Sequence, residues 1–498
     1  MASYYFYMCW NAKYAVLIFF STMVTWVSGL LLDRCRDGGS DSGNGGCNSS
    51  ESEGRKKLTV RRELIVAGSF ILNLSVLFWF KYANFAFDTM EKLFSAVHIT
   101  LQLPAVDVLL PVGISFYTFQ ALSYTMDVYR GEIYAEKDFF RYALFVSFFP
   151  QLVAGPIERS KNLLRQLAKT TEFNYERARE GMLLMLWGYF LKLVLADRIA
   201  IFVDTAYNNY AVYTGWYLVA ATMLFAMQIY CDFSGYSVIA IGAAKILGID
   251  LMENFDAPYL SNSVAGFWRH WHISLTSWFK DYLYIPLGGS RCGKVRKYIN
   301  KMIVFLASGL WHGASISFVV WGGLNGLYQI IEELGAELLK SAKPKATVNA
   351  AASKYSGTRT PGDPGWIGAA AKWLLGCIIT FILVDFSWIF FRANGCREAL
   401  LIIRHMADLR LQGLSMLTDG SLYLCGLDRA NFLLMLAALL VLLAADICKK
   451  RGIVLRRVVL RQVLPVRCIL FTAAVCAVLT FGVWGPAFSE ANFIYFQF

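Results

Sequence analysis

The chain has 498 residues, of which 57% are hydrophobic and only 16% charged, with a formal net charge of +12. Because soluble domains are about 25% charged, this composition excludes an ordinary soluble protein and indicates an integral membrane protein. The positive charge lies in short loops between apolar runs, a pattern typical of cytoplasmic loops, so we do not expect a nucleic-acid partner.

The first apolar run covers residues 14–32, and a polar stretch over residues 33–62 follows it. The run is too long for the core of a signal peptide and lacks a small-residue cleavage site, so it predicts a retained membrane helix. The polar stretch is rich in Gly, Ser and Asn at its centre and in Lys and Arg at its flanks. It predicts a basic, partly disordered cytoplasmic loop and an N-terminus outside.

Further apolar runs follow at residues 63–82, 108–129, 142–153, 182–195, 213–230, 299–310, 317–331, 366–391, 432–445 and 468–483. With the first run, they predict an all-α integral membrane protein with roughly 10–12 transmembrane helices. We expect a single polytopic membrane domain over residues 1–498. The run at 299–310 is short enough to be re-entrant, because broken helices are tolerated where protein or water covers them.

Four segments between these runs differ from them in composition. Residues 160–169 and 399–411 mix Leu or Ile with Lys and Arg at near-helical spacing, which predicts amphipathic helices at the membrane interface. Residues 340–364 are rich in Ala, Ser, Lys, Gly and Pro and predict a flexible loop. The basic segment 448–467 predicts another cytoplasmic loop.

The 11 cysteines have no C-x-x-C spacing, so we expect neither structural zinc nor a disulfide framework.

Three of the five histidines fall between residues 270 and 312. His312 directly follows an apolar run and lies between Gly309 and Gly313, which allow a substrate or a second helix to come close. A polar ring at membrane depth costs free energy unless it is satisfied, and such residues usually serve function. Two interpretations are open: a catalytic imidazole that faces a cavity, and a structural histidine that closes a helix end.

Residues 266–289 mix aromatic and polar side chains too densely for a simple lipid-facing span. One interpretation is that they line a cavity with His272 inward. Arg269, Lys280 and Arg291 would then offer positive charge to an anionic donor such as coenzyme A. The other interpretation is an aromatic belt at the membrane interface with snorkelling cations.

Transfer of an acyl group from a thioester to a hydroxyl needs a base for the hydroxyl proton, and a neutral imidazole suits this task. His312 and His272 are therefore the candidate catalytic residues. No G-x-S-x-G string supports a serine-hydrolase route, and no G-x-x-x-x-G-K-[ST] string supports ATP-driven transport. The candidate substrate-binding residues are Trp271, Trp311, Arg269, Lys280, Asp232 and Gln228. For Asp232 and Gln228 a structural hydrogen-bonding role is the alternative.

A series of strings runs along nearly the whole chain in a fixed order. They are LPVGISFYTFQ at 110–120, DVYRG at 127–131, FPQLVAGPI at 149–157, YCDFSGY at 230–236, WH at 271–272 and 311–312, WIFFRA at 388–393 and FIYFQF at 493–498. Together they resemble the membrane-bound O-acyltransferase family, in the bacterial branch that includes the alginate O-acetylation protein.

The resemblance implies a ring of membrane helices around a central tunnel, with the family core over residues 108–392. It implies that His312 is the catalytic residue and that His272 is a second functional residue in the same tunnel. The family usually has Arg at the position of His270, so we do not expect His270 to be catalytic.

The same resemblance implies a multi-pass enzyme of the inner, cytoplasmic membrane that O-acetylates an exported polysaccharide or cell-wall glycan. Acetyl-coenzyme A is the expected donor substrate, no cofactor is expected to stay bound, and a periplasmic or surface acetyltransferase partner is expected to complete the transfer. Two alternatives stay open. One is D-alanyl transfer from a carrier protein toward teichoic acids, and the other is a non-catalytic transporter, which the absence of repeated halves disfavours.

Overall fold

The computed structural model describes residues 1–37, 49–106, 110–341, 366–409 and 415–484. These residues form helices joined by turns and loops, without a β-strand among them, which confirms the all-α prediction. Contacts divide the chain into two compact units. The first comprises residues 1–193, 231–253 and 458–498, and the second comprises residues 194–230 and 254–457.

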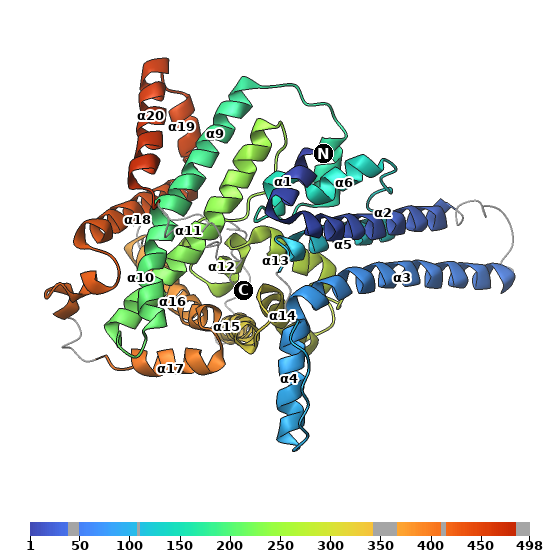
Figure 1. Ribbon diagram of the computed structural model, residues 1–498, viewed down its shortest axis with the longest axis horizontal. Coiled ribbons are helices and arrows are strands. Elements are labelled where there is room, and N and C mark those ends of the chain that lie inside the picture. Colours follow the sequence, from blue (N-terminus) through green and yellow to red (C-terminus); the bar gives the residue numbers. More distant parts are fainter. Residues whose placement is uncertain (38–48, 107–109, 342–365, 410–414, 485–498) are drawn as a thin grey trace, which may run out of the picture. The chain divides into compact units, whose positions relative to one another are not determined.

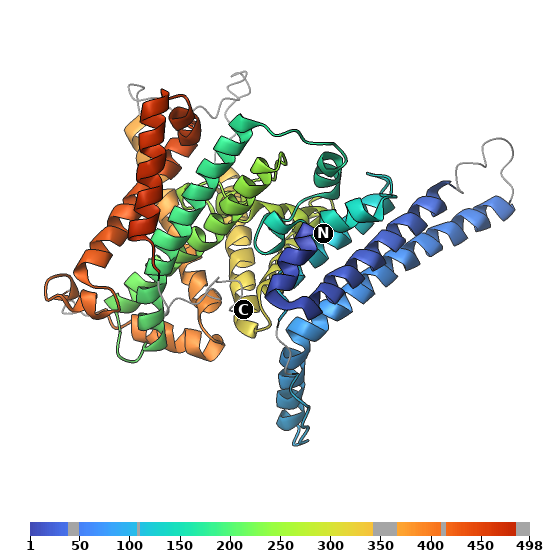
Figure 2. The same cartoon turned by 45° about the horizontal axis from the view of Figure 1, so that its top comes forward.

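The first unit contains mainly N-terminal helices. They are α1 (Ala2–Asn11), α2 (Ala15–Asp37), α3 (Ser49–Leu77), α4 (Ala83–Ala96), α5 (Ile114–Tyr129), α6 (Phe139–Ser147), α7 (Phe149–Leu152), α8 (Ser160–Leu167), α9 (Tyr175–Tyr189) and α20 (Leu464–Phe481). The π-helical turn Phe78–Tyr82 continues α3, and the π-helical turn Phe190–Ala196 continues α9 past residue 193, where the second unit begins. Helices α2 and α3 lie side by side as a long antiparallel pair, and α5 packs against both (Figures 1 and 2).

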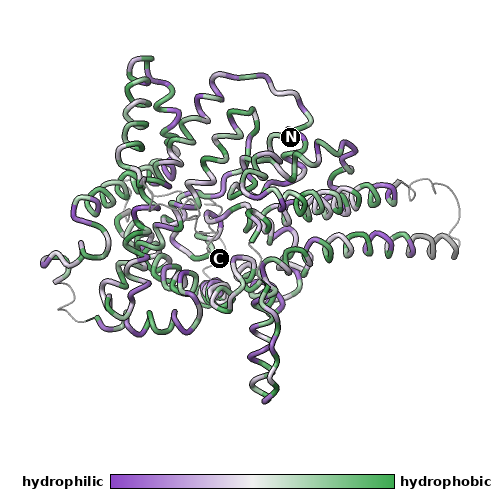
Figure 3. The backbone as a smooth tube through the Cα atoms, in the orientation of Figure 1, coloured by the Kyte–Doolittle hydropathy of each residue, from purple (hydrophilic) through white to green (hydrophobic). Residues whose placement is uncertain are grey.

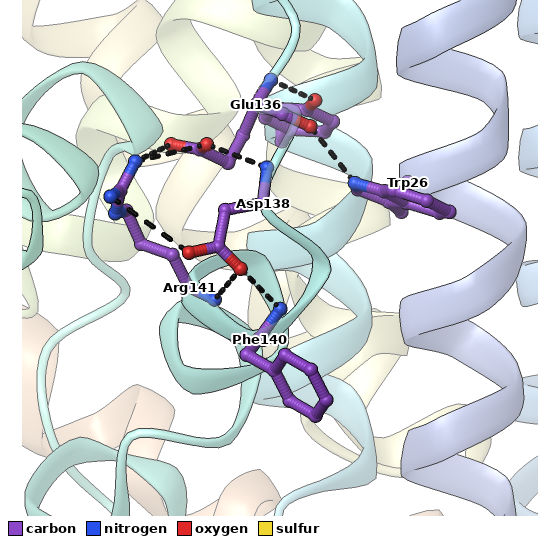
Figure 4. A network of polar contacts seen from close by, with 6 residues as sticks. Trp26, Glu136, Asp138, Phe140 and Arg141 are labelled. Carbon is purple, nitrogen blue, oxygen red and sulfur yellow. Dashed lines mark hydrogen bonds and ion pairs between the residues drawn. The ribbon is translucent and has the colours of Figure 1, made fainter.

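A polar network fixes the start of α6 in the first unit (Figure 4). Asp138 caps the helix, since its Oδ1 accepts the backbone N–H groups of Phe140 at 2.9 Å and Arg141 at 3.2 Å. The guanidinium of Arg141 lies 3.1 Å from the carboxylate of Glu136. Trp26 on α2 donates its indole N–H to the carbonyl oxygen of Glu136 at 2.8 Å. The network therefore joins α2 to the connection that precedes α6.

The second unit contains the middle of the chain. Its helices are α10 (Asp197–Asn208), α12 (Val264–His270), α13 (Ile273–Phe279), α14 (Lys294–His312), α15 (Ile316–Ser341), α16 (Trp366–Arg392), α17 (Cys396–Met406) and α18 (Arg429–Lys450). Helix α11 (Trp216–Ile246) contributes its first half to this unit and its second half to the first unit. The short α19 (Leu455–Leu460) is divided between the two units after residue 457. Helices α14 and α15 form a tight hairpin, and α16 packs against α15.

Hydrophobic residues run along the long helices of both units, as the green colour of Figure 3 shows. Six helical segments among the described residues are long and apolar enough to cross a membrane. They are Ala2–Arg36, Lys57–Ala96, Trp216–Ile246, Ile367–Arg392, Arg429–Lys450 and Leu464–Phe481. Other apolar runs form shorter or more charged helices, such as α5 and α14, and the expected count of roughly 10–12 spans stays a prediction.

Three predicted segments differ in detail from the structure. The apolar run at 142–153 is interrupted, since α6 ends at Ser147 and the short α7 follows it. The polar stretch at 33–62 is helical at both flanks, where α2 continues to Asp37 and α3 begins at Ser49, while residues 38–48 lie outside the described part. The predicted flexible loop at 340–364 lies almost wholly outside the described residues.

Candidate active site

Helix α14 places His312 at its C-terminal end, directly before the turn into α15. The two helices come close because glycines face each other. A Cβ added to Gly309 would lie 2.2 Å from the carbonyl oxygen of Phe318, and one added to Gly322 would lie 2.2 Å from that of Phe305. The sequence left open whether a substrate or a second helix approaches Gly309, and the structure places α15 there.

Aromatic rings surround the imidazole of His312, whose side chain is buried. Its ring centroid lies 5.0 Å from the rings of Trp311 and Trp321 and 5.4 Å from that of Phe391. Trp321 in turn stacks on Trp388 at 5.4 Å. These side chains come from α14, α15 and α16, so three helices together build the surroundings of His312.

His272 lies in the bend between α12 and α13, and its backbone has a φ of 43°. This left-handed conformation is unusual for a residue with a side chain and costs on the order of 1–3 kcal/mol, which the surrounding packing must offset. The side chain is buried. Burial lowers the pKa of the His272 imidazole to about 3, so the ring is neutral at physiological pH.

The structure brings His272 and His312 together, although 39 residues separate them in the sequence. Their ring centroids lie 6.4 Å apart, and both rings lie against Trp311, at 6.0 and 5.0 Å. Two buried imidazoles at this separation can act on one substrate, since a reacting group that contacts one ring is within a few ångströms of the other. The two histidines that the sequence suggested as catalytic residues are therefore neighbours in the second unit.

Asn254 also belongs to this site, although the sequence analysis did not single it out. Its side-chain oxygen lies 3.2 Å from Nδ1 of His272. The same oxygen accepts the backbone N–H of Ser274 at 3.3 Å and the hydroxyl of Ser274 at 2.7 Å. Nothing in the local sequence distinguishes Asn254 from a loop asparagine, because the contact depends on how the segment after α11 folds back on residues 270–274.

Comparisons with known proteins identify the family. The model of the membrane-bound O-acyltransferase family matches residues 131–351, which include both histidines. A probable alginate O-acetylase, AlgI, from Pseudomonas aeruginosa is 34% identical over 432 residues, which is 86% of this chain and 71% of that protein. The chain belongs to the membrane-bound O-acyltransferase family.

Two further relatives of this O-acyltransferase are named for other activities. A peptidoglycan O-acetyltransferase from Helicobacter pylori is 30% identical over 435 residues, covering 82% of this chain and 73% of that protein. A teichoic acid D-alanyltransferase from Bacillus subtilis is 26% identical over 224 residues, covering 42% of this chain and 56% of that protein.

The other predicted site residues of the O-acyltransferase lie in several places. Trp271 is buried among the rings of Phe255, Phe267 and Trp388, at 5.1 to 5.2 Å, so it helps to build the aromatic core behind His272. Trp311 contacts both histidine rings. These positions do not test whether either tryptophan touches a substrate, so that role stays a prediction.

The three predicted cations of the second unit, Arg269, Lys280 and Arg291, are exposed. Arg269 donates from Nε to the carbonyl oxygen of Ala265 at 3.2 Å, which leaves its terminal nitrogens for other partners. Exposed cations can bind an anionic donor, and they can also extend toward lipid headgroups at the membrane interface. Both interpretations of these three residues therefore stay open.

Asp232 and Gln228 both lie on α11 but fall in different units. In the first unit, Asp232 is 2.7 Å from Nζ of Lys192, and both side chains are almost fully buried. This ion pair supports the structural alternative for Asp232. In the second unit, Gln228 is buried, and no described residue donates a hydrogen bond to its Oε1.

His270 lies apart from the candidate pair of His272 and His312. Its Nε2 is 3.6 Å from the carboxylate of Asp256, its Nδ1 is 2.8 Å from the carbonyl oxygen of Gly266, and its side chain is one-third exposed. Lys449 and Lys450 at the end of α18 also lie within 3.5 Å of Asp256. Within the described ranges, no group of three His, Cys, Asp or Glu side chains is arranged to hold a metal ion.

Proposed function

We propose that this protein transfers an acetyl group from a cytoplasmic thioester donor to a hydroxyl group of an exported glycan. The observation that carries the proposal is the buried pair of His272 and His312, whose ring centroids are 6.4 Å apart. The relatives support the glycan acceptor, because one is named an alginate O-acetylase and another a peptidoglycan O-acetyltransferase.

In the proposed reaction, a ring nitrogen of His312 accepts the proton of the acceptor hydroxyl as its oxygen attacks the thioester carbonyl. The new C–O bond forms and the C–S bond breaks, and the proton on His312 passes to the departing thiolate. A positioned base of this kind contributes about 10²–10⁴-fold to the rate. The role of His272 is to hold the reacting group and assist proton movement from the neighbouring ring.

Trp311, Trp321 and Phe391 lie within 5.4 Å of the ring of His312, centroid to centroid. Apolar rings this close to a reacting thioester would keep water away from it. We propose acetyl-coenzyme A as the donor substrate, with its phosphates near the exposed cations Arg269, Lys280 and Arg291.

We place the enzyme in the inner, cytoplasmic membrane, with the acceptor glycan and a periplasmic or surface acetyltransferase as partners outside it. The basic segment at 448–467 supports a cytoplasmic location for that loop. The D-alanyltransferase relative supports a second candidate function, transfer of D-alanine from a carrier protein. That relative matches only 42% of this chain.

The test is release of coenzyme A from acetyl-coenzyme A by the purified protein in liposomes that contain an acceptor glycan. We expect His312→Ala to lose at least about 100-fold in rate, as removal of a general base does. His270→Ala is the matched control, since it removes a nearby histidine whose side chain points to Asp256, and it should retain most activity.

Equal rates in the wild type and His312→Ala, with both proteins folded, would refute the proposed role of His312. Release only from a D-alanyl carrier protein would refute the acetyl donor in favour of the second candidate. Movement of an intact acylated carrier across the liposome, without thioester cleavage, would refute an acyl-transfer reaction altogether.

A further inference from the structure

The side chain of Asn254 places one amide atom beside the imidazole of His272. Oxygen and nitrogen of an asparagine amide are hard to distinguish by position, so their assignment must come from hydrogen bonds. The side-chain atom of Asn254 nearest to His272 also receives the backbone N–H of Ser274 at 3.3 Å. A backbone N–H can only donate, so this atom must be the amide oxygen.

The identity of that oxygen decides the tautomer of His272. A carbonyl oxygen only accepts hydrogen bonds, so Nδ1 of His272, 3.2 Å away, must carry the hydrogen. A neutral imidazole has one N–H, and Nε2 therefore carries the lone pair. The ring is neutral because it is buried, and burial disfavours the charged form.

We propose that Asn254 is a positioning residue that holds His272 in the Nδ1–H tautomer and so makes Nε2 the nitrogen that accepts a proton or hydrogen bond during acyl transfer. The kinetic part of this inference rests on the proposed function of His272. The tautomer itself does not, because it follows from the hydrogen bonds alone.

The backbone around Asn254 supports a fixed arrangement. The carbonyl oxygen of Asn254 accepts the N–H of Ile273 at 2.9 Å, and the N–H of Asp256 donates to the carbonyl oxygen of His270 at 3.0 Å. Residues 254–256 are thus joined to residues 270–273 on both sides of His272. The side chains of Asn254 and Ser274 are buried as well. A buried partner held this way sets ring orientation and tautomer before substrate arrives.

The spectroscopic test uses the full chain in lipid nanodiscs, labelled with ¹⁵N-histidine and measured by NMR without substrate. The signal of His272 is identified by its loss in His272→Gln. We expect the wild type to give the chemical shifts of an Nδ1–H imidazole. Asn254→Leu should yield a mixture or the Nε2–H form, whereas Asn254→Asp, which keeps an acceptor oxygen, should retain Nδ1–H.

A matched control removes another buried amide from the same unit. Asn300 donates from Nδ2 to the carbonyl oxygens of Leu287 and Gly289, and its bonds do not involve His272. Asn300→Leu should therefore leave the His272 signal unchanged. An Nε2–H signal in the wild type, or the same signal in the wild type and Asn254→Leu, would overturn the assignment.

The kinetic arm compares the same variants in the thioester assay. We expect Asn254→Leu to lower kcat by about 10- to 100-fold with little change in KM, and Asn254→Asp to recover much of the loss. An unchanged kcat in Asn254→Leu would overturn the positioning role even if the tautomer changes. If the wild type itself transfers no acyl group, the proposed function fails while the NMR result still decides the tautomer.

Discussion

At the scale of single residues, the site combines groups with different constraints. His312 ends a helix within an aromatic enclosure, whereas His272 adopts a strained left-handed backbone in a bend. Asn254 fixes one nitrogen of His272 by a hydrogen bond. Strain and buried polar contacts of this kind cost stability, and they persist where a precise geometry serves function.

The pH dependence of stability should report the burial of His272. Its folded pKa is about 3, whereas a histidine in an unfolded chain has a pKa of about 6.5. The unfolded state therefore binds the proton more tightly, so stability is fully present above about pH 6.5 and is lost as the pH falls toward 3. Thermal unfolding in detergent should show a steeper loss between pH 6.5 and 4 for the wild type than for His272→Gln.

His270→Gln is the control for that experiment, because the side chain of His270 is one-third exposed and pairs with Asp256. We expect this variant to keep the steep wild-type slope over the same pH range. Parallel slopes for the wild type and His272→Gln would contradict the burial of a neutral imidazole at position 272.

At the scale of elements, the hairpin of α14 and α15 determines where His312 lies. The backbones approach so closely that Gly309 and Gly322 have no room for a side chain. Small residues allow this kind of helix contact in membrane proteins, where van der Waals packing replaces the hydrophobic effect between helices. Any change that separates α14 from α15 should also move His312 relative to Trp321.

Two adjacent glycines of α15 provide a matched test of this packing. A Cβ at Gly322 would lie 2.2 Å from the carbonyl oxygen of Phe305, whereas one at Gly323 would meet Cδ2 of Leu306 at an ordinary 3.5 Å. We expect Gly322→Ala to lower the free energy of unfolding by about 1–3 kcal/mol. Gly323→Ala should be neutral or stabilise by up to about 1 kcal/mol, because alanine favours a helix.

Denaturant unfolding in mixed micelles measures the stability of the two alanine variants, and the thioester assay measures their activity. Gly322→Ala should also lose activity, since it displaces the helix that carries His312. Equal stability and equal activity for the two alanine variants would show that the close contact between the helices is not needed.

At the scale of the whole molecule, each unit has its own core and its own long-range ion pairs. In the first unit, Lys192 and Asp232 form an almost fully buried pair. In the second unit, Asp256 pairs with Lys449 and Lys450, which lie far away in the sequence, and its side chain is about one-third exposed. Partial burial raises the pKa of Asp256, but Lys449, Lys450 and His270 lower it by more, so its net pKa is below the ordinary value.

The two ion pairs should differ in energy and in salt dependence. Asp232→Asn removes the buried carboxylate that faces Lys192 and should cost about 3–5 kcal/mol, at low and high salt alike. Asp256→Asn should cost at most about 1 kcal/mol, and less at high salt, because water and ions screen a partly exposed pair. The effect of Asp256→Asn should begin to shrink as the pH falls through about 4, the ordinary carboxyl pKa, and should vanish only below the lower pKa of Asp256 in the folded protein. Thermal unfolding in detergent measures both, and equal costs would contradict the difference in burial.

Sequence by itself determined the membrane class, the helical fold and the two candidate histidines. Hydropathy and helix formation depend on residues close in the chain, and a histidine beside an apolar run is visible without a structure. The family strings also lie in local segments such as 271–272 and 311–312. Local hydropathy does not reveal where a run such as 142–153 is interrupted, so the expected count of roughly 10–12 spans stays a prediction.

Only the tertiary structure decided which residues meet. It brought His272 to His312, placed Trp321 and Phe391 around His312, and set Asn254 against His272. It also paired Asp232 with Lys192, where the sequence had suggested a substrate contact as one option. These contacts join residues far apart in the chain, and they depend on how helices pack and how a loop folds back. No local pattern of residues encodes such distances, so the chemistry of the site became specific only once the fold was known.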